Sequence, residues 1–336
     1  MLEKPDIEEN RIAECLLAEY GISASRLLFL PLGSDINTAV YRVFVDNKTS
    51  FFLKLRKGQF NPTSVSLPRF LSGLGIPQII PALETTSGRL WGKLDAYKTV
   101  LYPYIEGRDG YEVQLSDRHW RELGTALNRI HNAVLPPALL SGLRSEDFSP
   151  HFRQGVKSFL SSLDKVISDD PITIELAAFL REKQAEILDL VERAEQLAQI
   201  VQKQPLAFTV CHADLHAGNI FIAAGGSFYL VDWDEALLAP KERDLMFIGG
   251  GLLASGLTAQ QEEALFYQAY GQTNVNRPAL AYYRFERIIQ DIAAFCAQLL
   301  LTDAGGADRQ QALIYLKSNF LPGNTIEIAR QSDRSW

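Results

Sequence analysis

Two short polar stretches decide the fold class of this chain: CHADLHAGN at residues 211–219 and LVDWDEA at residues 230–236. The segment that joins them has two apolar runs, one on each side of the pair Gly225-Gly226. Short apolar runs that flank a glycine pair are typical of a β-hairpin. Folding at the glycines is expected to place Asn219, at the end of the first stretch, opposite Asp232 in the second.

The residues at this expected hairpin suit a metal-assisted reaction. The amide oxygen of Asn219 and the carboxylate of Asp232 would lie side by side, and Mg²⁺ prefers such oxygen ligands. Asp214 lies five residues before Asn219, on the preceding loop, where a carboxylate could reach a substrate hydroxyl. The sequence therefore predicts a transfer site with Asp214 as general base.

Composition and charge narrow the class of protein. The chain has 336 residues, 47% of them hydrophobic, which is enough for a large core divided between two lobes or domains. Its 40 acidic and 33 basic residues give a net charge of −7, which disfavours a nucleic-acid partner and suits cationic or neutral small ligands. Three widely spaced cysteines, Cys15, Cys211 and Cys296, indicate neither a disulfide framework nor a structural zinc site.

No segment is typical of a signal peptide or a membrane span. The first residues, MLEKPDIEENR, lack the apolar core of a signal peptide. The longest apolar stretch, at residues 245–257, is rich in glycine and too short to cross a bilayer. We therefore expect a soluble protein of the reducing cytoplasm, with no membrane partner.

Residues 1–103 predict a small, strand-rich lobe. An amphipathic helix is expected over residues 6–20, and prolines keep any helix within residues 61–80 short. The β-prone runs lie at about 26–32, 38–45 and 50–55, and two more lie within residues 91–107.

Residues 104–336 predict a larger, helical lobe. Apolar residues recur at helical spacing after Ser116, and either Ser116 or Asp117 is a candidate N-cap for this helix. A helical insertion is expected at about 145–205, made of two amphipathic helices, the second of which begins after Asp170-Pro171.

The pattern His212-x-Asp214-x-x-x-x-Asn219, followed by Asp232, resembles the catalytic loop and metal-binding strand end of protein-kinase-like enzymes. The context agrees, because Lys54 lies on the third expected strand, downstream of a glycine turn. From about residue 21 to residue 300 the chain resembles the aminoglycoside phosphotransferases, which use this form of the loop. The resemblance implies an α+β, bilobal, protein-kinase-like fold with a small strand-rich N-lobe and a larger helical C-lobe.

The same resemblance implies roles for the site residues. Asp214 is the expected catalytic base, Asn219 and Asp232 are the expected Mg²⁺ ligands, and Asp244 is expected to brace the catalytic loop. The nucleotide, ATP or GTP, is expected to bind through Lys54, Gly33, Ser34 and Asn37 at its phosphates and through the Pro103 carbonyl and the Ile105 N–H at the adenine edge. The N-terminal lobe would thus bind the nucleotide, and the C-terminal lobe would hold the catalytic residues and the acceptor.

Two features depart from the pattern of kinases. The glutamate that normally pairs with the strand lysine is missing, because no acidic residue lies between Lys54 and Glu84. Either another carboxylate holds Lys54, with Asp232 as a candidate, or the lobe is arranged unusually. The loop LGSDINTA, at residues 32–39, has one glycine where kinases have three, so Ser34 and Asn37 are expected to supply the missing donors.

Acidic residues near the expected site indicate a cationic acceptor. Asp234, Glu235 and Asp109 are the predicted acceptor-binding residues, with Glu106, Glu112, Glu286 and Asp291 as further acids. The predicted activity is transfer of the γ-phosphoryl group to a hydroxyl of an aminocyclitol or aminoglycoside antibiotic such as spectinomycin. Two alternatives remain: a housekeeping kinase for choline, homoserine or a thio-sugar, and a nucleotide-binding pseudokinase.

Overall fold

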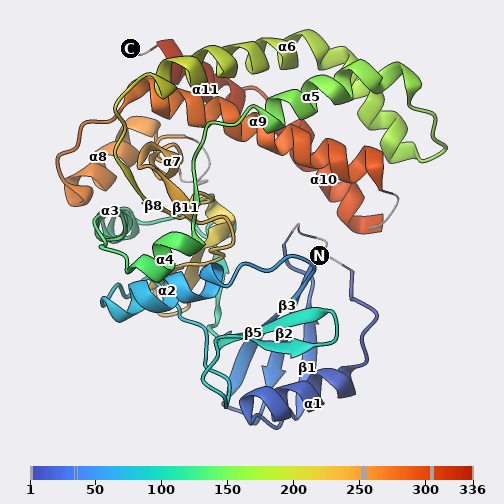
Figure 1. The fold of residues 1–336 in the computed structure, drawn as a ribbon, viewed down its shortest axis with the longest axis vertical. Coiled ribbons are helices and arrows are strands. Elements are labelled where there is room, and N and C mark those ends of the chain that lie inside the picture. The colour runs from blue at the N-terminus through green and yellow to red at the C-terminus, as the bar shows by residue number, and fades with distance from the viewer. Residues whose placement is uncertain (1–2, 34, 36, 251–255, 303–305, 335–336) are drawn as a thin grey trace. The chain divides into compact units, whose positions relative to one another are not determined.

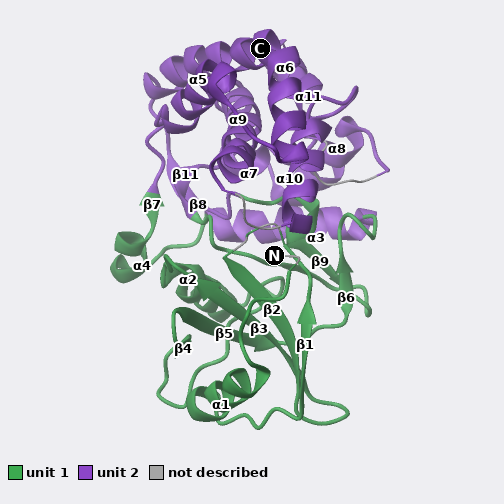
Figure 2. Cartoon of the chain, turned by 90° about the vertical axis from the view of Figure 1, so that its right-hand side faces the viewer, with its two compact units in different colours: residues 1–114, 132–144, 214–236 green, residues 115–131, 145–213, 237–336 purple. Residues whose placement is uncertain are grey.

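The computed structural model describes residues 3–33, 35, 37–250, 256–302 and 306–334 (Figure 1). Two compact units divide the chain (Figure 2). Unit 1 consists of Met1–Gln114, Asn132–Arg144 and Asp214–Ala236, and unit 2 consists of Leu115–His131, Ser145–Ala213 and Leu237–Trp336. This division differs from the predicted boundary at residue 103, because two later segments of the chain pack with the first. No helix within the described residues is long and apolar enough to span a membrane.

An antiparallel sheet of five strands, in the order β1-β2-β3-β5-β4, forms the core of unit 1. Helix α1 packs against the sheet, and its Ile12 and Leu16 share a core cluster with Tyr41 and Leu53. The elements are α1 (Glu9–Tyr20), β1 (Arg26–Leu30), β2 (Thr38–Phe44), β3 (Ser50–Lys57), β4 (Gly92–Leu94) and β5 (Tyr97–Pro103). Alternating apolar residues thus predicted these strands within a few residues of their ends.

Strand β3 is the middle strand of this sheet, and its register fixes where Lys54 lies. Lys54 is paired with Val40 of β2 on one side and with Val100 of β5 on the other. Successive side chains of a strand point to opposite faces, so the fully buried Leu53 and Leu55 lie on one face of β3. Lys54 therefore lies on the face opposite this apolar core.

A second sheet of unit 1, in the order β10-β9-β6, carries the predicted hairpin. Its strands are β6 (Gly107–Asp109), β9 (Ile220–Ala223) and β10 (Phe228–Leu230), and the turn η2 (Ala217–Asn219) precedes β9. The predicted pairing of Asn219 with Asp232 is wrong by one residue, because the Val231 N–H donates to the Asn219 carbonyl at 3.0 Å. The Ala223 N–H donates to the Ser227 carbonyl, so the loop between this bonded pair has three residues, 224–226, and ends at Gly226 with φ of +81°. The length of this loop sets the register of the hairpin.

The remaining elements of unit 1 are two helices, α2 (Thr63–Gly73) and α4 (Pro137–Gly142). Although prolines led us to expect a short helix here, α2 has 11 residues and includes Pro68. Pro62 lies directly before the first turn, where the missing N–H costs nothing, and Pro68 removes only one hydrogen bond inside the helix.

Unit 2 is helical, with α9 at its centre. Figure 1 shows α9 running along α5 and α6, the two helices that were predicted within about residues 145–205. Asp170 caps α6 by accepting the N–H groups of Ile172 and Thr173. The helices are α3 (Asp117–His131), α5 (His151–Ser162), η1 (Leu163–Lys165), α6 (Pro171–Gln202), α7 (Glu242–Leu245), α8 (Ala259–Tyr270), α9 (Arg277–Leu301), α10 (Gly306–Ser318) and α11 (Thr325–Arg334). Strands β8 (Phe208–Cys211) and β11 (Leu237–Pro240) pair antiparallel within the unit, and β7 (Arg144–Ser145) begins where unit 1 ends.

Glu286, one of the further acids expected near the acceptor, is buried in unit 2 with 3% of its surface exposed. Arg153 Nε lies 3.6 Å from Glu286 Oε2, and neither atom has a hydrogen bond among the described residues. Burial raises the pKa of the Glu286 carboxyl from 4.5 to about 7, although the charges of Arg153 and Arg243 oppose the rise. The carboxylates of Glu146 and Glu195 add to it.

We expect Glu286 to make the stability of the chain depend on pH. Its folded pKa is higher than its unfolded pKa, so its contribution is fully present below pH 4.5 and is lost as pH rises through about 7. Glu286→Gln keeps the shape and removes this titration. Urea unfolding at pH 5 and pH 8 measures the effect. Between these pH values the free energy of unfolding of the wild type should fall by on the order of 2–3 kcal/mol more than that of the variant.

Glu182→Gln, at an exposed position of α6, is the matched control and should leave the pH dependence of the wild type unchanged. If the free energy of unfolding changes with pH in the same way in the wild type and in Glu286→Gln, the prediction is wrong. Arg153 would then keep Glu286 ionised in the folded protein.

Candidate functional site

The backbone that precedes Asp214 is fixed by a buried carboxylate of unit 2. Asp244 accepts the N–H of His212 at 3.0 Å and the N–H of Ala213 at 2.7 Å. Ala213 has φ of +70°, a left-handed conformation that is costly for a residue with a side chain and persists only where its surroundings enforce it. Asp214 follows directly in the chain. The structure therefore gives Asp244 the bracing contacts expected of it.

Asp244 stays ionised although it is fully buried. Burial opposes the charge, but the hydrogen bond and charge of His131, the charge of His212 and the N–H of Ala213 outweigh burial, so the pKa of the carboxyl lies below its ordinary value. An ionised acceptor makes stronger hydrogen bonds to backbone N–H groups than a neutral one. The loop is thus held by charge-assisted hydrogen bonds.

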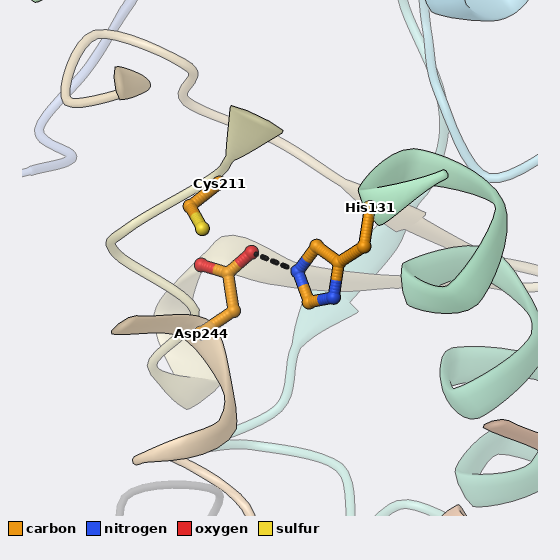
Figure 3. A group of neighbouring side chains, drawn as sticks. All are labelled: His131, Cys211 and Asp244. Atoms are coloured by element: carbon orange, nitrogen blue, oxygen red, sulfur yellow. Dashed lines mark hydrogen bonds and ion pairs between the residues drawn. The ribbon is translucent and has the colours of Figure 1, made fainter. Parts of the chain in front are cut away.

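Figure 3 shows His131, Cys211 and Asp244 turned toward one another, a grouping whose atom types could ligate a metal. Their polar atoms are already engaged. His131 Nε2 lies 2.9 Å from Asp244 Oδ2, and its Nδ1 lies 2.8 Å from the Tyr270 hydroxyl. The Cys211 thiol lies 3.6 Å from the Pro240 carbonyl, and burial raises its pKa well above the ordinary value. This closed network supports the loop and does not fit a metal site.

Asp214 belongs to unit 1, and Asn219 orients it. The Asn219 amide donates from Nδ2 to the Asp214 carbonyl at 2.7 Å and to Asp214 Oδ2 at 3.0 Å. His216 Nε2 lies 3.5 Å from the same carboxylate oxygen. Because Nδ2 of Asn219 is used in this way, its Oδ1 points elsewhere, and no described residue bonds to it. Asp214 is therefore a positioned carboxylate, as a general base requires.

Asp232 and Asn219 fit the expected magnesium site in their chemistry. Asp232 follows β10, and its side chain is 48% exposed, so a carboxylate oxygen can meet a hydrated ion. Its φ of +61° is a second left-handed conformation beside the site. The donor set of one carboxylate and one amide oxygen is hard and oxygen-only, as Mg²⁺ prefers.

Lys54 bonds to two carboxylates that follow the hairpin. Its Nζ lies 3.0 Å from Asp232 Oδ1 and 2.9 Å from Asp234 Oδ2, and only 14% of its side chain is exposed. Burial by itself would lower the pKa of the ammonium, but the two carboxylates outweigh burial and raise it above its ordinary value. Of the two possibilities for the missing helix glutamate, the structure shows the first: another carboxylate holds Lys54.

The predicted nucleotide-binding residues are less completely defined. Gly33 has φ of +80°, which suits a turn between β1 and β2, and the Asn37 N–H donates to Asp35 at 2.8 Å. Ser34 lies outside the described residues. Pro103 ends β5 and is exposed, and the Ile105 N–H has no partner within the described parts of the chain.

The three predicted acceptor-binding acids have separate partners. Asp109 accepts the N–H of Tyr111 at 2.9 Å in a local turn. Glu235 forms an exposed ion pair with Arg144 at 2.9 Å. Asp234 bonds to Lys54, as described above, and also to Arg56, which the sequence did not single out. The alternation of side chains along a strand could have indicated Arg56, because it lies two positions after Lys54 and therefore on the same face of β3.

Comparisons with known proteins show which family and which solved structures the chain resembles. The sequence profile described as the phosphotransferase enzyme family matches residues 29–283. A solved structure of spectinomycin phosphotransferase APH(9)-Ia, in complex with ADP and spectinomycin, is 35% identical over 98% of this chain and 99% of that chain, with a TM-score of 0.90. A search of curated proteins finds no match.

More distant structures share the fold. Amicoumacin kinase hAmiN, in complex with AMP-PNP, Ca²⁺ and Ami, is 14% identical over 96% of this chain and 97% of that chain, with a TM-score of 0.62. Choline kinase LicA from Streptococcus pneumoniae is 18% identical over 92% and 99%, with a TM-score of 0.56. The chain therefore belongs to the phosphotransferase enzyme family and has the predicted α+β, protein-kinase-like fold.

Proposed function

We propose that this protein transfers the γ-phosphoryl group of ATP, or of GTP, to a hydroxyl of an aminocyclitol or aminoglycoside antibiotic, with spectinomycin as the first candidate. One observation carries the proposal: direct contacts within unit 1 join Asn219 to Asp214 and Lys54 to Asp232. The 35% identity to a spectinomycin phosphotransferase over 98% of the chain supports the choice of acceptor.

Asp214 would orient the acceptor hydroxyl and accept its proton as the new phosphate ester forms. Phosphoryl transfer requires little covalent chemistry from the enzyme, so positioning and charge supply most of the catalysis. The two hydrogen bonds from Asn219 hold the Asp214 carboxylate in one orientation before the acceptor binds. Such preorganisation lowers the cost of reaching the reactive geometry.

Asn219 and Asp232 would hold Mg²⁺, which when bound would neutralise charge on the nucleotide phosphates. Lys54 would contact these phosphates, together with Gly33, Ser34 and Asn37 of the turn after β1. The Pro103 carbonyl and the Ile105 N–H would meet the edge of the adenine. Structures of APH(9)-Ia contain ADP or AMP, which supports an adenine nucleotide as donor.

The ion pairs of Lys54 bear on the pseudokinase alternative. That alternative rested on the missing glutamate, without which Lys54 would be poorly held. With Asp232 and Asp234 on its ammonium, Lys54 is fixed and charged, and Asp214 and Asn219 are also in place. These contacts of Lys54 favour the phosphotransferase over the pseudokinase.

Asp214→Ala should lower turnover by about 10²- to 10⁴-fold, the usual range for a positioned acid or base. The affinity for nucleotide should change little, because in the proposal Asp214 contacts the acceptor hydroxyl and is neither a metal ligand nor a phosphate contact. Steady-state kinetics with spectinomycin and equilibrium nucleotide binding measure the two effects. Asp164→Ala, which removes an exposed carboxylate of unit 2, is the control and should leave both unchanged.

Asp232→Ala should damage binding of the magnesium–nucleotide complex, since it removes a proposed metal ligand. Calorimetric titration of nucleotide with and without Mg²⁺ should show that Mg²⁺ no longer increases affinity in this variant, whereas Asp214→Ala retains the increase. Equal loss of nucleotide binding in both variants would contradict the proposed division of roles.

The acceptor should be cationic. We expect phosphorylation of spectinomycin with a KM that rises several-fold between about 0.05 and 0.5 M salt, since salt screens attraction between an ammonium and acidic side chains. A panel that also includes choline, homoserine and a thio-sugar measures the preference. Activity confined to an uncharged or acidic acceptor would favour the housekeeping kinase.

A further inference from the structure

Two basic residues lie on the same face of β3. Lys54 and Arg56 are two positions apart, so their side chains leave the strand on one side, while Leu53 and Leu55 are buried on the other. Each of these cations has carboxylate partners. The proposed function uses Lys54 alone, and Arg56 has no role in it.

Asp234 joins the two cations through a single oxygen. Its Oδ2 lies 2.9 Å from Lys54 Nζ and 2.6 Å from Arg56 Nη1, and its side chain is 23% exposed. Charge-assisted hydrogen bonds of this length are among the strong ones in proteins. These two bonds restrict the orientation of the Asp234 side chain and also the positions of the Lys54 and Arg56 head groups.

Arg56 continues the network into the turn before β2. Its Nη1 lies 3.0 Å from Asp35 Oδ2 and 3.3 Å from Thr38 Oγ1. Asp35 in turn accepts the Asn37 N–H at 2.8 Å and the Thr38 hydroxyl at 2.8 Å. Asp234 is therefore linked, through Arg56, to the turn that was predicted to hold the nucleotide phosphates.

No acid of the neighbouring helix can take this place. Helix α2 contains neither Asp nor Glu, and the next acidic residue, Glu84, forms an exposed ion pair with Arg69 at 2.7 Å. Asp232 is the other partner of Lys54, but it is also a proposed magnesium ligand. Asp234 is therefore the carboxylate that can remain bonded to Lys54 while Asp232 binds the proposed Mg²⁺.

We propose that Asp234 is a positioning residue for the nucleotide: it replaces the missing helix glutamate, holds Lys54 toward the phosphates and, through Arg56, couples Lys54 to Asp35 and Thr38. The proposal rests on the proposed function, in which Lys54 binds those phosphates. It gives Asp234 a different role from the acceptor contact that the sequence suggested.

Asp234→Asn tests this role, because it keeps the size of the side chain and removes its charge. We expect the nucleotide KM and Kd to rise about tenfold, while the acceptor KM changes less than about twofold. Asp95→Asn is the matched control: Asp95 also pairs with an arginine of unit 1, Arg11 at 2.7 Å, and this change should leave all three constants as in the wild type.

Arg56→Gln is the second variant and removes the other half of the bridge. If Asp234 acts through the coupled network, the double variant should weaken nucleotide binding by less than the product of the two single effects, because both changes break the same Arg56–Asp234 contact. Circular dichroism confirms that each variant is folded. Should Asp234→Asn fail to fold, Arg56→Gln must by itself raise the nucleotide Kd about threefold or more, or the proposal is wrong.

The outcomes separate the two proposals. An Asp234→Asn variant that raises only the acceptor KM, or simple additivity of the two single variants, overturns the positioning role and leaves the phosphotransferase intact. A wild-type protein that binds no nucleotide overturns both.

Discussion

A lysine ammonium in the middle strand of a sheet must have carboxylate partners, and this requirement organises unit 1. Leaving a charge largely buried without a partner costs several kcal/mol. Lys54 meets the requirement with Asp232 and Asp234, which lie 178 and 180 residues later in the chain. The hairpin β9–β10 brings both carboxylates into unit 1. The sheet, the hairpin and the candidate site are thus held together by the same pair of ion contacts.

Two separate interactions explain how the structure maintains two strained residues. Ala213 and Asp232 both have positive φ, at a cost of roughly 1–3 kcal/mol each. Hydrogen bonds to the buried Asp244 fix the first, and the ion pair with Lys54 fixes the second. Each unit therefore supplies its own restraint at or beside a residue of the candidate site. Such strain near a reacting centre is common, because it aims side chains that a relaxed backbone would not.

Local patterns in the sequence predicted most of the secondary structure and named Lys54, Asp214, Asn219 and Asp232 in advance. Strand alternation and helical periodicity are short-range signals, so they survive without knowledge of the tertiary structure. The hairpin register was wrong by one residue, because the exact turn geometry at Gly226 is set by a single backbone conformation. The partners of Asp234 were also missed: contacts between residues 180 apart leave no trace in a periodic pattern. Because Asp234 follows the proposed metal ligand Asp232, the sequence suggested that Asp234 contacts the acceptor. The structure shows instead that it bonds to Lys54 and Arg56, which share one face of β3.

The composition of unit 1 from three separate segments has a consequence for synthesis. Residues 1–114 emerge first, but the hairpin that completes the unit ends at Ala236. At ribosomal rates of about 5–20 residues per second, roughly 10–40 s pass between the emergence of Lys54 and that of Asp234, which are 180 residues apart. During this interval the nascent sheet carries a charge that its mature partners cannot neutralise, so β3 cannot reach its final environment. The unit that begins first therefore cannot be finished before all of residues 145–213, which belong to the helical unit, have been made.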